Sequence, residues 1–208
     1  MAGINNEVWV FVEQRGGSAA DVSLELLSKG RKLADAMSGS LKSVVIGDAV
    51  RPIAIETFQF GADESFLIQH PVLKDYKTLP YSRILNDLIK HHSPRVVLFG
   101  ATIIGRDLAP RVASNTLSGL TADCTDLKIA DIDYLGKEYQ TLLLQIRPAF
   151  GGNIIATIIT PDNPIQMATV REGVMEKHQA GTVRDINIVE IPYTPDGVED
   201  LVTIVEQH

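Results

Sequence analysis

The sequence predicts an α/β fold: an open, mostly parallel sheet with helices on both faces, followed by an antiparallel, strand-rich extension. Two observations predict this fold. Over the first two-thirds of the 208 residues, short apolar runs alternate with segments whose apolar residues recur at helical spacing, which is the pattern of a parallel sheet with crossover helices. After Gly119, strand-like segments follow one another without a long helix between them, which favours antiparallel pairing.

Four strands are expected in the first part of the chain. Each is a short run that is apolar on nearly every residue, as is typical of strands buried on both faces. The predicted strands cover residues 8–12, 41–46, 65–68 and 96–99.

Four helical segments follow these strands in order. Asp21 is expected to cap the first helix, and Gly39 is expected to terminate it. Pro80 suits the first turn of the third helix, and Ser93 precedes the proline that breaks it. The segments run from Asp21 to Gly39, over residues 50–60, from Pro80 to Ser93, and onward from the loop that Gly100 opens.

The antiparallel extension is expected to contain four strands, over residues 121–132, 139–146, 153–159 and 183–191. From Val198, apolar residues again recur at helical spacing, and this pattern runs to the last residue, His208. We therefore expect an amphipathic helix to begin at Val198.

Composition narrows the classes of function. The formal net charge of −7 disfavours a nucleic-acid or anionic-membrane surface, because phosphate groups select for an excess of lysine and arginine. The single cysteine, Cys124, rules out an internal disulfide and a cysteine-rich zinc site, so a reducing compartment, the cytoplasm, is expected. No run of about 18 apolar residues occurs, so no membrane span is expected. Small molecules and proteins are the expected partners.

The loop after the fourth predicted strand is the first candidate site. Residues 100–107 (GATIIGRD) lead from the strand into a helix, where open α/β sheets bind ligands and the helix dipole attracts anions. The loop matches neither the Walker nor the dinucleotide fingerprint. Two interpretations stay open: a nucleotide site, or a tight structural turn whose Arg106 and Asp107 pair with neighbouring charges.

The second candidate site is residues 147–153 (RPAFGGN), at the end of an apolar strand. Arg147 supplies a fixed cation, and the two glycines let the backbone approach a flat ligand closely. A ligand site and a structural turn are both open interpretations.

Other reactive residue types favour structural roles. His91 and His92 are adjacent at a helix end, so a solvated terminus is favoured over a metal site. Cys124 lies between Asp123 and Asp126, whose charges disfavour a thiolate, so a buried structural cysteine is expected. No serine, histidine and carboxylate arrangement is recognisable. We therefore expect no independent catalytic activity and assign no metal ligand.

Three motifs occur in this order along the chain: GRDLAPR (105–111), GLTADCT (119–125) and RPAFGGN (147–153). They are the most specific of several stretches that together resemble the alpha subunit of electron transfer flavoproteins. The resemblance runs from residue 8 to about residue 192 and includes residues 166–174 (QMATVREGV). It implies a fold similar to adenine-nucleotide-binding α/β domains (adenine nucleotide alpha hydrolase-like) and a heterodimer with a beta subunit of related fold.

The resemblance also implies flavin chemistry. The alpha subunit normally continues into a second domain that binds FAD, whose motifs do not occur here. Residues 1–192 are therefore expected to be the amino-terminal domain, and residues 193–208 the linker toward a missing FAD domain. Residues 13–15 (EQR) and 22–35 look more like the electron-bifurcating group, in which a second FAD, on the beta subunit, accepts hydride from NADH.

The resemblance assigns two sets of site residues. The flavin shared with the beta subunit would lie against Arg147, Pro148, Ala149, Phe150, Gly151 and Gly152. In the bifurcating group, the matching arginine approaches the isoalloxazine ring of that flavin. The heterodimer interface would include Gly105, Arg106, Asp107, Arg111, Thr121 and Asp123.

Three functions compete at this point. The first is an electron-transfer subunit that carries electrons between NADH or an acyl-CoA dehydrogenase and another acceptor, with bifurcation as its specialised form. The second is a regulatory module that binds AMP or ATP and has no redox role. The third is a structural partner domain that completes the site of the beta subunit and binds nothing itself.

Overall fold

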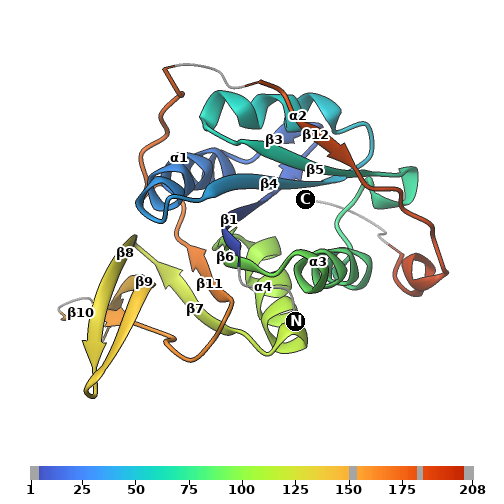
Figure 1. Cartoon of the computed structure of the whole chain (residues 1–208). Helices are drawn as coiled ribbons and strands as arrows, with labels where there is room; N and C mark the ends of the chain where they lie inside the picture. The colour runs from blue at the N-terminus through green and yellow to red at the C-terminus, as the bar shows by residue number, and fades with distance from the viewer. Residues whose placement is uncertain (1–4, 150–153, 182–184, 204–208) are drawn as a thin grey trace.

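The computed structural model describes residues 5–149, 154–181 and 185–203. Its centre is a parallel sheet of seven strands in the order β12-β5-β4-β1-β6-β11-β7 (Figure 1). These strands are β1 (Asn5–Val12), β4 (Ser40–Gly47), β5 (Glu64–Gln69), β6 (Pro94–Gly100), β7 (Gly119–Cys124), β11 (Gln166–Val170) and β12 (Ile188–Glu190).

A separate antiparallel sheet projects from the β7 side of the parallel sheet (Figure 1). We call it the arm, and it consists of β8 (Asp126–Tyr134), β9 (Lys137–Ala149) and β10 (Ile154–Ile158). A short hairpin follows β1 and pairs β2 (Gln14–Arg15) with β3 (Ser18–Ala19). The α/β class with an antiparallel extension, predicted from the sequence, is confirmed.

Among the described residues, four α-helices form the outer layers: α1 (Asp21–Ala36), α2 (Arg51–Glu56), α3 (Thr78–His92) and α4 (Ile103–Thr116). The 3-10 turns are η1 (Thr57–Phe60), η2 (Pro71–Leu73) and η4 (Val198–Leu201). In the described part of the chain, no helix combines the length and the apolar character that crossing a membrane requires.

Alternation along β1 explains why helices cover both faces of the sheet. Val8, Val10 and Val12 pack in one core cluster with α1 and α2. Trp9 and Phe11 point to the opposite face and pack with α3 and α4. All five side chains are at most 3% exposed. A strand that is apolar on every residue is thus buried on both faces, as its pattern predicted.

The strand order reverses beside β1. Helix α1 leads from β1 to β4 on one side of it, whereas β6, on the other side, is reached later through α3. The carboxyl ends of β1 and β6 therefore border the crevice where open α/β sheets bind ligands.

Part of the predicted antiparallel extension belongs to the parallel sheet. The expected strand over residues 121–132 is two strands, β7 and β8, and β7 pairs in parallel with β11. The break follows a β-bulge in β7, where Asp123 adopts left-handed backbone (φ 62°) and turns the chain out of the sheet. The prediction of one continuous antiparallel strand here is wrong.

Strands β11 and β12 also pair in parallel. Strand β11 was not predicted, although all five of its residues are buried between β6 and β7. Of the expected strand over residues 183–191, the structure forms β12, which pairs with β5 at the far edge of the sheet. Both strands pair with segments that are distant in sequence. The spacing of apolar residues within one segment therefore could not indicate this pairing.

The helix predictions need two corrections. Helix α1 begins at Asp21, but Ala20 occupies the N-cap position and no side chain caps the helix; Asp21 instead places its charge in the first turn, where the dipole favours it. In the described part of the amphipathic helix expected from Val198, the structure has a single 3-10 turn, which ends where Val202 adopts extended backbone. The boundary at residue 192 stays a prediction.

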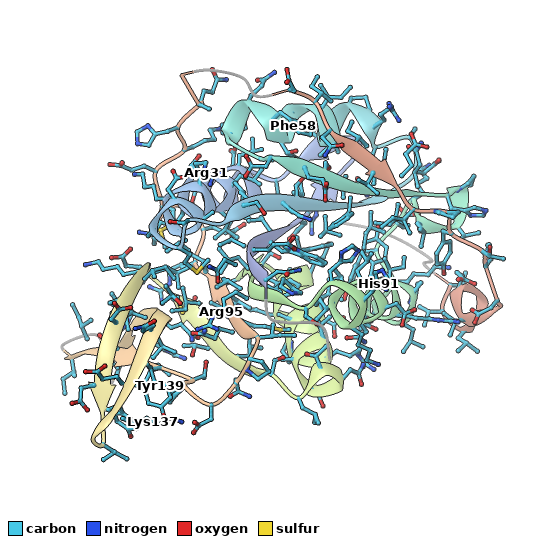
Figure 2. All side chains as sticks on the ribbon, viewed as in Figure 1. Arg31, Phe58, His91, Arg95, Lys137 and Tyr139 are labelled. Carbon is cyan, nitrogen blue, oxygen red and sulfur yellow. The ribbon has the colours of Figure 1, made fainter. Side chains whose placement is uncertain are left out.

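The arm is fixed to the parallel sheet near both of its edges. Near the amino edge, Arg95 of β6 donates from Nη2 to the carbonyl oxygen of Gln140 at 3.1 Å, and Figure 2 shows Arg95 between the arm and the rest of the domain. Toward the carboxyl edge, the backbone N–H of Thr125 donates to the carbonyl of Ile146 at 2.8 Å. Leu143 of β9 is fully buried in the core of the domain. The end of β9 is therefore held at the carboxyl edge of the sheet.

Candidate functional site

Three arginines and one aspartate meet at the carboxyl edge of the sheet. Arg106 lies in the first turn of α4, Asp123 in β7, and Arg147 near the end of β9, whereas Arg171 directly follows β11. Asp123 accepts hydrogen bonds from Nη2 and Nε of Arg171 at 2.6 and 3.3 Å, and from Nη2 of Arg106 at 3.4 Å. We call these four residues the arginine cluster.

The positive charges act on Asp123 together. The hydrogen bond from Arg171 is the main cause that lowers the pKa of Asp123, and the charges of Arg171, Arg106 and Arg147 lower this pKa further. Within the described residues, the guanidinium of Arg147 makes no hydrogen bond, although it is close enough to Asp123 to affect its ionisation. Within the described part of the chain, the cluster thus contains two arginines that bond to Asp123 and one that makes no hydrogen bond.

Backbone geometry explains how Asp123 reaches this position. Its left-handed conformation (φ 62°) is one that aspartate tolerates better than most residues, and Thr169 holds it by accepting the Asp123 backbone N–H at 2.9 Å. Residues kept in such conformations cluster at functional sites. The bulge therefore points a carboxylate at the arginines.

Strand register places Arg147 beside Asp123. Ile146 pairs with Asp126 across the arm, so the next residue, Arg147, lies level with the end of β7. On the other side, Arg147 pairs with Ala156, and Ala149 pairs with Ile154. Because alternate residues of a strand share a face, Ile154 lies on the same face of the arm as Arg147.

The predicted flavin-contacting residues fall partly outside the described chain. Arg147, Pro148 and Ala149 are half-buried at the end of β9. Phe150, Gly151 and Gly152 lie outside the described residues.

The predicted interface residues separate into three places. Arg106 and Asp123 belong to the arginine cluster, as described. Asp107 and Arg111 lie farther along α4, where Asp107 accepts hydrogen bonds from the hydroxyls of Tyr76 at 2.7 Å and Thr78 at 2.5 Å. Although burial raises the pKa of Asp107, the hydrogen bonds from Thr78 and Tyr76 and the charge of Arg111 leave it below its ordinary value.

Gly105 and Thr121 lie inside the domain. The side chain of Thr121 is buried. A Cβ atom on Gly105 would be 1.8 Å from the carbonyl oxygen of Gly100, a separation far below van der Waals contact. Packing within the chain is therefore sufficient to explain a glycine at position 105.

The structure favours the structural-turn interpretation of the loop over residues 100–107. The hydroxyl oxygen of Thr102 accepts the backbone N–H of Gly105 at 2.9 Å and so caps α4. The same hydroxyl donates to the carboxyl of Glu13 at 2.5 Å. Ala101 donates its N–H to Val170. The carboxyl group of Glu13 therefore already lies at the amino terminus of α4. A phosphate group approaching this terminus would meet this carboxyl group, so the position is unfavourable for binding phosphate.

Glu13 gives this loop a testable pH dependence. Its side chain is 6% exposed, and burial raises its pKa, opposed in part by the hydrogen bond from Thr102. A raised folded-state pKa stabilises the fold below the unfolded-state pKa, and this stabilisation is lost as pH rises through the folded-state value. Glu13→Gln should therefore gain stability relative to the parent between about pH 4 and pH 7. Urea unfolding at both pH values measures the gain, and an equal difference at both would contradict the assignment.

Cys124 and the two histidines are structural in the described part of the chain. Burial raises the pKa of the Cys124 thiol to about 12, and the side chain is fully buried, as the sequence predicted. The ring of His92 packs against Phe66, with ring centroids 4.8 Å apart, while His91 is exposed on α3 (Figure 2). The described residues contain no group of three or more His, Cys, Asp or Glu side chains that could hold a metal ion.

Arg171 is the site residue that the sequence analysis missed. It belongs to the quoted stretch QMATVREGV, but without β11 there was no strand end to place it on. The sequence signal that could have indicated this position is the mostly apolar run of residues 166–170, which is followed directly by the charged residue Arg171.

The fold and the arginine cluster define this chain as a doubly wound α/β domain with a cluster of arginines at its carboxyl edge. The electron transfer flavoprotein domain model matches residues 8–196. Because this match covers most of the 208 residues, the chain belongs to the electron transfer flavoprotein family.

Curated relatives narrow the assignment within the family. The electron transfer flavoprotein subunit alpha of Thermoanaerobacterium thermosaccharolyticum is 45% identical over 184 residues, which cover 88% of this chain and 53% of the relative. The acryloyl-CoA reductase electron transfer subunit beta of Anaerotignum propionicum is 43% identical over 186 residues, with 82% and 51% covered. Protein FixB of Azorhizobium caulinodans is 44% identical over 171 residues, with 81% and 44% covered.

The resemblance to alpha subunits predicted from the sequence is confirmed by these matches. The chain spans about half the length of the curated relatives it matches.

Proposed function

We propose that this chain pairs with the beta subunit of an electron transfer flavoprotein and presents Arg147 to a flavin, FAD, held by that subunit. Membership of the family supports an electron-transfer role. The observation that carries the proposal is the guanidinium of Arg147, which lies at the carboxyl edge beside Asp123 and makes no hydrogen bond within the described residues. A cation with free donors at an exposed edge suits an electron-rich, planar ligand.

The residues present fit a flavin on chemical grounds. A bound flavin supplies one- and two-electron transfer, and the protein tunes it through nearby charges and hydrogen bonds. Arg147 would donate to the ring and offset the negative charge of the reduced form, while Pro148 and Ala149 would lie beside it. We propose that Phe150, Gly151 and Gly152 also lie against this flavin.

Exposed apolar side chains near the cluster support a protein partner. Ile103 at the start of α4 is 82% exposed, and Ile154 of β10 is 54% exposed. Arg106 lies one helical turn from Ile103 and is also exposed. Arginine surrounded by apolar residues is a composition that protein interfaces favour. We name Ile103, Arg106, Arg147 and Ile154 the carboxyl-edge surface and propose that it contacts the beta subunit.

The wider role is proposed by analogy with the relatives. The heterodimer would carry electrons between NADH or an acyl-CoA dehydrogenase and another acceptor, and the name of the acryloyl-CoA reductase relative supports the acyl-CoA alternative. Flavin-based bifurcation with NADH as the donor, a second FAD in a further domain, residues 1–192 as the amino-terminal domain and a cytoplasmic location belong to the same proposal.

Association tests the proposal directly. Purified alone, the chain should lack tightly bound flavin and form unstable or non-native oligomers, because its carboxyl-edge surface is exposed. Co-expressed with a beta subunit, it should form a one-to-one complex with flavin absorbance. Light scattering and visible spectra measure both, and a well-behaved, flavin-bound monomer would contradict the proposal.

A matched pair of variants locates the interface. Ile103→Ser should weaken the complex, because it removes an exposed apolar side chain from the carboxyl-edge surface. Leu117→Ser is the control, since Leu117 is 85% exposed at the opposite end of α4, about 20 Å away. Equal affinities for the two variants would place the partner elsewhere.

A further inference from the structure

The arginine cluster contains one aspartate for three arginines, so its members compete for a single carboxylate. Arg171 occupies both oxygens of Asp123 through Nη2 and Nε, while Arg106 reaches one oxygen at 3.4 Å. Arg147 is close enough to act electrostatically on Asp123, but it makes no hydrogen bond to this residue. Among the described residues, Asp123 thus bonds to Arg171 and Arg106 and not to Arg147.

We infer that Arg171 is a positioning residue: by occupying the carboxylate of Asp123, it keeps the guanidinium of Arg147 free to donate to a ligand at the carboxyl edge. Bidentate pairing between arginine and a carboxylate is geometrically favoured. Without Arg171, the Oδ2 atom of Asp123 loses its short contact, and Arg106, which bonds to Oδ1, and Arg147 are the cations of the cluster that remain. Arg147 would then pair with Asp123 and be withdrawn from the ligand.

Two variants of the cluster isolate this effect without disturbing the fold. Arg171→Gln changes a side chain that is 48% exposed and retains the backbone hydrogen bond from Arg171 to the carbonyl of Cys124. Asp123→Asn is compatible with the left-handed backbone, which asparagine tolerates well, and retains the N–H bond to Thr169. Lys32→Gln on the exposed surface of α1 changes net charge equally and is the control.

The inference rests on the proposed function for its consequence, but its first test does not involve flavin chemistry. In the heterodimer stripped of flavin, with arginine labelled by ¹⁵N in this chain, the Nε–H signal of Arg147 is assigned by its loss in Arg147→Lys. Arg171→Gln should slow hydrogen exchange of this Nε–H about tenfold, because a charge-assisted hydrogen bond to Asp123 forms. The double variant Arg171→Gln/Asp123→Asn should restore the original exchange rate, and Lys32→Gln should not change it.

The second measurement is the midpoint potential of the flavin in the same heterodimers with flavin bound. Arg171→Gln should lower it, since Arg147 no longer offsets the charge of the reduced flavin, and adding Asp123→Asn should bring it back toward the parent value. If Arg171 had only a structural role, adding Asp123→Asn to Arg171→Gln would not restore the midpoint potential of the flavin.

Unchanged exchange of Arg147 in Arg171→Gln, or exchange that Asp123→Asn does not restore, would overturn the inference. A second outcome is that hydrogen exchange changes as expected while the midpoint potential of the flavin is the same in all variants. This outcome would support the positioning role of Arg171 and would refute the proposed contact between Arg147 and the flavin.

Discussion

Arg147→Ala in the heterodimer with the beta subunit is expected to lower the midpoint potential of the beta-subunit flavin and slow its reduction by NADH. The physical reason is the loss of one charge-assisted hydrogen bond to a flavin that gains negative charge on reduction, which costs roughly 1.5 to 3 kcal/mol. This energy corresponds to a change of about tenfold to more than a hundredfold in the equilibrium between the two redox states. Redox titration and stopped-flow reduction measure the two effects.

Arg147→Lys serves as the graded control. Lysine retains the charge but lacks the planar fork of donors, so it should rescue only part of the loss. The fold should survive both substitutions, because the side chain is only half-buried at a strand end. If both variants kept the parent potential and NADH kinetics while the heterodimer dissociated, Arg147 would be an interface residue and the proposed role would be wrong.

Gly105→Ala is expected to destabilise the chain by at least about 3 kcal/mol, toward the upper end of overpacking costs. The added methyl group would be 1.8 Å from the carbonyl oxygen of Gly100 and 3.0 Å from its carbonyl carbon. Both contacts are with backbone, which cannot move aside without breaking the turn between β6 and α4. Thermal or urea unfolding measures the loss.

Gly181→Ala is the matched control, since a Cβ atom there meets nothing within 4 Å and should change stability by less than about 0.5 kcal/mol. The comparison also decides how to interpret position 105, which the sequence resemblance placed at the heterodimer interface. A stable Gly105→Ala chain that fails only to bind the beta subunit would restore the interface role and contradict the packing argument.

Local sequence pattern was sufficient for the four strands of the parallel sheet that come before residue 101. Each of β1, β4, β5 and β6 contains a short, mostly apolar run, and these strands alternate regularly with helices, so their existence and parallel pairing could be predicted. Strand β11 could not, because its five buried residues include two polar ones, Gln166 and Thr169. These two residues are buried because β11 lies between β6 and β7. The local sequence pattern does not show this position in the sheet.

The same limit applies to the candidate site. Arg106, Asp123 and Arg147 were named from motifs, but nothing in their spacing showed that they meet around one carboxylate. Their meeting depends on the bulge at Asp123 and on the register of β9 against β8. Asp107 lies apart from the cluster: it follows Arg106 directly in sequence, yet its carboxylate accepts hydrogen bonds from Tyr76 and Thr78.

The position of β11 has a consequence for how the chain folds during synthesis. Strands β6 and β7 are synthesised before the arm, and the arm is synthesised before β11. Strand β11 lies between β6 and β7 in the sheet. Until β11 arrives, both strands have unpaired edges beside apolar surface, a state that invites pairing with other chains. Strand β12, which completes the opposite edge against β5, comes later still. The nascent domain therefore depends on its last strands for closure, and such non-local pairing slows folding and lengthens the time over which chaperones can act.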